Sequence, residues 1–138
     1  MMDHEKNWPL QAILDEVSDA RTALLVADDG LVTQWAGAGL DRDEADRAAA
    51  VASSAKGACA AMAAVFAGVE AASLQDVVVR TADNGYILLT PTGRNSTLAV
   101  HAGPGVRLEQ LAYVVRDQIG RLAGKTMAAR VRTGDARS

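Results

Sequence analysis

The chain has 138 residues, of which 49% are hydrophobic, 4% aromatic and 22% charged, and its formal net charge is -3. This length suits one domain with a single core, and a mildly acidic body disfavours nucleic acid as the main ligand, because phosphate binding requires a basic face. No run approaches the roughly 18 apolar residues of a membrane span, and the polar start MMDHEKNW does not resemble a signal peptide. The single cysteine, Cys59, allows no internal disulfide, so we expect a cytoplasmic protein without a membrane span.

The first forty residues predict a short helix and a hairpin. Residues 1–8 are polar and are expected to be flexible. Apolar residues between positions 9 and 17 recur at helical spacing, and Pro9 suits the first turn of that helix. Two apolar segments, 22–27 and 31–36, flank the turn Asp28-Asp29-Gly30 and predict two paired strands.

Residues 41–70 predict one long helix, around which the rest of the chain is organised. Asp41 is placed to cap it, and Glu44 stands at capping-box spacing. Larger apolar residues recur at helical spacing and are expected to face the core: Val51, Ala55, Cys59 or Ala58, Met62, Val65 or Phe66, and Val69. A second row holds only small residues and could allow close packing on a partner molecule: Ser53, Gly57, Ala61 or Ala60, Ala64 and Gly68. An alanine-rich composition alone could also produce this second row.

The second half predicts three strands and a closing helix. Segments 76–81, 86–90 and 97–102 are β-rich, and Asn84-Gly85 is a strong hairpin signal. Apolar residues from position 106 recur at helical spacing, and Gly124 is placed to end that helix. Residues 125–138 carry a net charge of +3 and are expected to form a disordered tail, which could instead contact an acidic partner or a membrane surface.

The predicted order of elements is therefore α-β-β-α-β-β-β-α. Hairpin connections imply an antiparallel sheet, and helices must cover at least one face of it. The fold class is α+β, a single-domain sandwich with a five-stranded antiparallel sheet and a long central helix. The domain is expected to span residues 9–124.

No group of residues predicts catalysis, a cofactor or a metal site. The segment 120–126 is one residue short of a phosphate-binding loop and ends a helix, and Gly103-Pro104-Gly105 fits a turn. The only histidines are His4 and His101, and His101 lies in a predicted strand with no Cys, Asp or Glu at ligand spacing. The arginines Arg80 and Arg94 could reach a partner's nucleotide phosphate, although solvated side chains are expected by default.

The segments TALLVADDGLVTQW and STLAVHAGPGVRLEQLAYVVRDQIGRL, together with the small-residue helix, resemble the Roadblock/dynein light-chain family. The resemblance covers Leu10 to Leu122 and implies a profilin-like, roadblock architecture and a homodimer in which the third strand and the long helix meet their copies across a twofold axis. It also implies a non-enzymatic partner of small Ras-like GTPases, some of whose relatives activate hydrolysis. The actinobacterial members to which it is most similar are thought to act in signalling operons with a GTPase and a sensor kinase.

Combined with the small row and the strand edge at 76–81, the resemblance gives a set of predicted interface residues: Ser53, Gly57, Ala60, Ala61, Ala64, Gly68, Val77 and Val79. Two other functions stay open at this point. One is a PAS-like small-molecule sensor with a pocket over the sheet lined by Trp35, Tyr86 and His101, and the other is a purely structural dimerisation adaptor.

Overall fold

The computed structural model describes residues 8–37 and 39–137, and it describes side chains for residues 9–37 and 39–122. The predicted order of elements is confirmed, with one 3-10 helix added after the long helix. The elements are α2 (Trp8–Glu16), β1 (Ala20–Ala27), β2 (Val32–Ala36), α3 (Arg42–Ala67), η1 (Val69–Ala72), β3 (Val77–Arg80), β4 (Tyr86–Pro91), β5 (Ser96–Ala102) and α4 (Leu108–Arg137). The described residues do not include residues 1–7, which were expected to be flexible and which contain His4.

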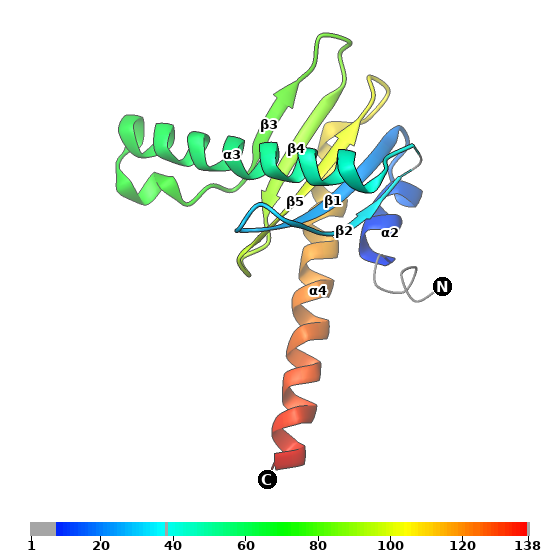
Figure 1. Ribbon diagram of the computed structural model, residues 1–138, viewed down its shortest axis with the longest axis vertical. Helices are drawn as coiled ribbons and strands as arrows, with labels where there is room; N and C mark the ends of the chain where they lie inside the picture. The colour runs from blue at the N-terminus through cyan, green and yellow to red at the C-terminus, as the bar shows by residue number, and fades with distance from the viewer. Residues whose placement is uncertain (1–7, 38, 138) are drawn as a thin grey trace.

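The five strands form one antiparallel sheet in the order β2-β1-β5-β4-β3. Helices α2 and α4 lie on one face, and α3 crosses the other (Figure 1). The fold is therefore the predicted α+β sandwich. Strand β3 forms one edge of the sheet and β2 the other.

The face under α2 and α4 holds the larger core. Its fully buried side chains come from both helices and from the three central strands, and they include Leu10, Ile13, Leu88, Leu98, Val100, Leu111 and Val115. Each such side chain contributes roughly 1.5–3 kcal/mol when buried. This face fixes the sheet, so α3 needs only a narrow contact on the opposite face.

Helix α3 begins as its sequence predicts. The Asp41 carboxylate accepts a hydrogen bond from the backbone N–H of Glu44 at 2.8 Å. Its contact with the sheet, however, consists of the buried alanines Ala45, Ala49 and Ala52. Small side chains let the helix axis lie close to the strands, where these alanines pack on Leu24, Val26, Val32, Leu89 and Ala99.

Both long helices end elsewhere than predicted. Helix α3 stops at Ala67, because Gly68 takes a φ of +94°, and η1 follows. Helix α4 continues through Gly124 to Arg137, so much of the segment expected to be a disordered tail is helical. One glycine inside a helix costs only about 1 kcal/mol, and the alanines and arginines that follow favour helix.

Candidate protein interface

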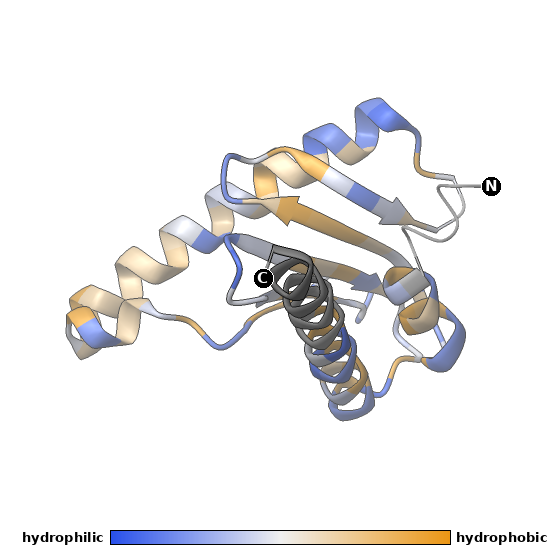
Figure 2. Cartoon of the chain, turned by 90° about the horizontal axis from the view of Figure 1, so that it is seen from below, coloured by the Kyte–Doolittle hydropathy of each residue, from blue (hydrophilic) through white to orange (hydrophobic). Residues whose placement is uncertain are grey.

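The far half of α3 extends past the β3 edge of the sheet, where it has no sheet of its own chain beneath it (Figure 1). Viewed from below, this overhanging end is coloured largely pale to orange, as expected for small and apolar residues (Figure 2). We call the segment from Met62 to Val69 the overhang. Its larger apolar side chains are exposed: Met62 by 53%, Val65 by 81%, Phe66 by 81% and Val69 by 84%.

These exposures correct the sequence interpretation of α3. The larger apolar row was expected in the core, but Val51 is also 67% exposed and Cys59 is only partly buried. The residues that pack on the sheet are alanines at positions 45, 49 and 52. Their helical spacing was present in the sequence, but an alanine row gives a weaker hydrophobic signal than valine, methionine and phenylalanine.

Strand β3 is a free edge of the sheet, and the overhang lies beyond it. It has four residues, and its valines are half-buried at Val77 and exposed at Val78 and Val79. Its backbone pairs on one side only, with β4. An apolar edge of this kind presents unpaired N–H and C=O groups that can pair with another strand.

The predicted interface residues lie on α3 and β3, except for Gly68, which caps the end of α3, and they differ in exposure. Ser53 is half-buried, and its Cβ lies 3.8 Å from the place where a Cβ on Gly30 would stand, so it faces the β1–β2 turn. Gly57 is exposed, with no neighbouring atom within 4 Å of an added Cβ. Of the others, Ala61, Gly68 and Val79 are exposed, and Ala60, Ala64 and Val77 are half-buried. Their role in an interface stays a prediction.

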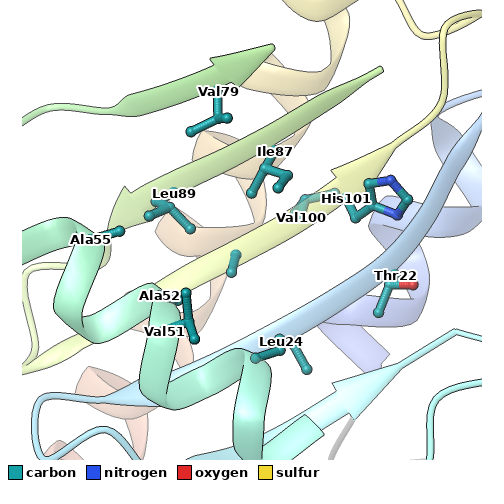
Figure 3. Close-up of a pocket in the computed structure, with 12 residues that line it drawn as sticks. Thr22, Leu24, Val51, Ala52, Ala55, Val79, Ile87, Leu89, Val100 and His101 are labelled. Atoms are coloured by element: carbon teal, nitrogen blue, oxygen red, sulfur yellow. The ribbon is translucent and has the colours of Figure 1, made fainter. Parts of the chain in front are cut away.

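An open apolar groove runs between α3 and the sheet, and sequence reasoning did not find it (Figure 3). Its volume is about 370 Å³. One wall is the flank of α3 that carries Val51 and Ala55, and the floor comes from four strands. The lining residues on those strands are Thr22 and Leu24 of β1, Val79 of β3, Ile87 and Leu89 of β4, and Ala99, Val100 and His101 of β5. Only Thr22 and His101 are polar.

The groove differs from the pocket that a small-molecule sensor was expected to have. His101 lines it, but Trp35 and Tyr86 do not. Trp35 packs beside the α3 contact with the Arg42 guanidinium 5.4 Å from its ring centre, whereas Tyr86 packs against the core on the opposite face. Few polar groups therefore converge in the groove.

The remaining candidate residues have structural roles. The Asp29 carboxylate accepts from the Leu31 N–H at 3.0 Å, and Asp28 pairs with Lys56 at 3.6 Å, as expected of turn residues. Arg80 donates to the Asn84 side chain at 3.4 Å. Among the described residues, no three His, Cys, Asp or Glu side chains lie close enough to hold a metal ion.

The two glycine-rich segments are also structural. Segment 120–126 lies within the continuous helix α4, which no phosphate-binding loop does. The 103–105 turn is clamped by Asp19, which accepts from the Gly103 N–H through its backbone carbonyl at 2.9 Å and from the Gly105 N–H through its carboxylate at 2.7 Å. The amides that could have bound an anion are thus already engaged.

Helix α3 is long and apolar enough to cross a membrane by length and composition, in contrast to the expectation from the sequence. Its capped first turn and the ion pair of Lys56 with the β1–β2 turn indicate that this helix packs on its own sheet and does not cross a membrane. Three alanines of α3 are also buried against the sheet. We therefore interpret its exposed apolar surface as a protein interface.

Comparisons with known proteins agree with this fold. A Roadblock/LC7 domain from Streptomyces avermitilis superposes with a TM-score of 0.76 at 26% identity, over 88% of this chain and 97% of that one. Myxococcus xanthus MglB gives 0.76 at 15% identity, over 90% and 96% of the two chains. LokiProfilin2, solved with rabbit actin, gives 0.53 at 10% identity, over 86% and 95%, which shows a profilin-like fold.

Curated protein sequences give no significant match. The Roadblock/LC7 domain model, however, matches residues 6–102, which is more than half of the sequence and includes α3 and the whole sheet. The chain belongs to the Roadblock/LC7 family.

Proposed function

We propose that this protein is a homodimer that binds a small Ras-like GTPase in the cytoplasm and shifts its nucleotide state or its location. The observation that carries the proposal is the exposed apolar surface of α3 beside the free edge of β3. Roadblock/LC7 membership supports a regulatory or scaffolding role. A sensor kinase or another protein of the same signalling system is a further candidate partner.

The cost of leaving this surface in water supports the proposed homodimer. Large apolar patches on soluble proteins mark interaction sites, and exposed apolar side chains lie both on the β3 edge and on the overhang that extends past it. A twofold axis through the β3 edge would pair two identical edges and bring two copies of α3 together. The predicted interface residues from Ser53 to Val79 lie on these two elements or, for Gly68, at the C-cap of α3.

The proposed action on a GTPase requires no catalytic group from this chain. GTP hydrolysis depends mainly on positioning and on charge stabilisation around the transferred phosphoryl group. A rigid dimer can act by holding the switch segments of a bound GTPase in one arrangement, or by inserting an arginine. Arg94 stands on the exposed β4–β5 turn and is one candidate for such a role.

The test is a pull-down of the purified small Ras-like GTPase of the same organism, loaded with GDP or with a non-hydrolysable GTP analogue. We expect binding that differs between the two nucleotide states, together with a changed rate of GTP hydrolysis or nucleotide exchange. Equal binding in both states would favour a structural adaptor. No binding in either state would contradict the proposal.

A small-molecule sensor is the second candidate, and the groove is the observation that favours it. Ligand sites usually combine an apolar lining with several convergent polar groups, and this groove offers only Thr22 and His101. Thermal shift measurements against a metabolite library test it directly. A ligand that raises the melting temperature of the wild type but not of an Ala52→Phe variant would support a sensor.

A further inference from the structure

Helix α4 continues well past the body of the protein. Among its described side chains, Ile119 is the last apolar one that packs on the larger core. An added Cβ at Gly120 would meet no atom within 4 Å, so the helix is already open on that side. The helix then runs on through residues 123–137, which span about 22 Å at 1.5 Å per residue, away from the sheet (Figure 1). We call residues 123–137 the α4 extension.

The α4 extension is basic, whereas the rest of the chain is acidic. It carries Lys125, Arg130, Arg132 and Arg137 against Asp135, a net charge of +3. Because the whole chain carries -3, the residues before the extension carry -6. Lys125, Arg130 and Arg137 have no Asp or Glu three or four positions away in the sequence, which is the spacing at which neighbours in a helix pair. The positive charge therefore has few partners within the helix itself.

The basic positions also share one half of the helix. With 3.6 residues per turn, Lys125 and Arg132 form one row, and Arg130 and Arg137 form a second row about 140° around the axis. Asp135 stands on the other half of the circumference. The α4 extension can therefore turn its two basic rows towards a flat, negatively charged surface while the acidic position faces away.

The length of the α4 extension separates its charge from the acidic body. Charges in water at physiological ionic strength are screened over about 8 Å, and the extension reaches nearly three times that distance beyond Leu122. The body therefore barely weakens the field at the far part of the extension. Helix α4 also lies on the face of the sheet opposite α3, so the extension stays accessible when the exposed surface of α3 is engaged (Figure 1).

We propose that the α4 extension binds the surface of an anionic lipid bilayer and holds the protein at a membrane. This inference goes beyond the proposed regulation of a GTPase and does not depend on the homodimer. It concerns electrostatic adsorption to the lipid headgroups, which clusters of about four or more basic residues support. The bilayer would hold the protein without any helix crossing it.

The composition of the α4 extension favours a lipid surface over an acidic protein. Protein interfaces are anchored at their centre by aromatic and large apolar side chains, and charged residues are depleted there. The extension contains no aromatic residue, and its only large apolar residues are Met127 and Val131. Adsorption to anionic headgroups requires no such anchor, because it depends on the number of positive charges near the surface.

Co-sedimentation of the full chain with lipid vesicles tests the proposal. We expect binding to vesicles of phosphatidylcholine mixed with phosphatidylglycerol, and no binding to pure phosphatidylcholine. Raising the ionic strength from about 0.1 M to about 1 M shortens the screening length from about 10 Å to about 3 Å and should release the protein. Equal binding to both kinds of vesicle would overturn the proposal, because an electrostatic site requires anionic lipid.

The triple variant Lys125→Gln/Arg130→Gln/Arg132→Gln removes three positive charges from the α4 extension. Each basic residue near an anionic surface typically strengthens binding about fivefold. We therefore expect the variant to bind anionic vesicles roughly a hundredfold more weakly than the wild type. Glutamine has a helix propensity similar to that of lysine and arginine, and circular dichroism verifies that the fold is intact.

A matched control removes three exposed basic residues from the body instead, as Arg42→Gln/Arg47→Gln/Arg107→Gln. The two triple variants have the same net charge, so their comparison separates the α4 extension from the charge of the protein as a whole. We expect the control to bind anionic vesicles about as tightly as the wild type. An equal loss in both variants would overturn the proposal.

The outcomes also separate a lipid surface from other anionic partners. Binding that is lost in the variant of the extension and kept in the control supports the proposal, whether the protein is a monomer or a dimer. No binding of the wild type to anionic vesicles overturns it. Tighter binding to double-stranded DNA than to anionic vesicles at the same ionic strength overturns it in favour of a nucleic acid.

Discussion

The carboxylate of Asp76 connects the start of β3 to helix α4, and replacing it should destabilise the protein. One of its oxygens accepts from the Thr90 hydroxyl at 2.9 Å, and the other accepts from the Arg116 guanidinium at 2.6 Å. Thr90 is only 5% exposed, so Asp76→Ala leaves a buried hydroxyl without this partner. Such a loss costs about 1–3 kcal/mol.

The ion pair adds less to the expected loss. The Arg116 side chain is 58% exposed, and pairs of that kind contribute about 0.2–1 kcal/mol. We therefore expect Asp76→Ala to lower the free energy of unfolding by about 2 kcal/mol, with a fall in melting temperature of about 6 °C for a chain of this length.

Urea denaturation at one fixed protein concentration measures this change, because the stability of a dimer depends on concentration. The double variant Asp76→Ala with Thr90→Val removes the unpaired hydroxyl as well and should recover most of the loss. A single variant within about 0.5 kcal/mol of the wild type, well below the loss expected from the unpaired hydroxyl, would refute the reasoning.

Three other predictions follow from described contacts. Gly57→Glu should split the dimer if the small row is part of the interface, and it should leave the monomer folded because an added Cβ meets no atom within 4 Å. Light scattering measures the dimer and circular dichroism the fold. An unchanged dimer would remove Gly57 from the interface. Deleting residues after Arg130 should leave the fold intact, because the described core of α4 lies before Leu122, and a large fall in melting temperature would show that this segment is docked. The Thr81 hydroxyl and, to a smaller extent, the Gly85 N–H donate to the Asp83 carboxylate and hold its pKa below 3.8. These hydrogen bonds therefore stabilise the folded protein above about pH 4, and this stabilisation is lost as the pH falls through the pKa of Asp83 in the folded protein. An NMR titration should find that pKa raised in Thr81→Val, and an unchanged midpoint would contradict this assignment.

The sequence predicted the fold because its signals were local. Asp41 and Glu44 marked the start of α3, and Asn84-Gly85 marked the β3–β4 hairpin, where Asn84 takes a φ of +68°. Hairpin connections then required an antiparallel sheet. The ends of both long helices were predicted wrongly, because Gly124 lies inside a continuous helix and α3, expected to run to residue 70, stops at Ala67.

The candidate interface was predicted only in part. Its elements, α3 and β3, were named from the sequence, but the larger apolar row of α3 was wrongly assigned to the core of its own chain. Hydrophobic periodicity identifies the face of a helix that is buried. It does not indicate whether that face packs on its own chain or on another chain. Val65 and Phe66 give the same signal in either case, so only the position of α3 over the edge of the sheet shows that they lie beyond it.

The molar mass in solution tests the central claim most directly, by light scattering behind a sizing column over a tenfold range of concentration. We expect a stable mass near twice the 14.4 kDa of one chain. A mass that stays near 14.4 kDa at every concentration would contradict the homodimer and leave the exposed apolar surface of α3 for a different partner.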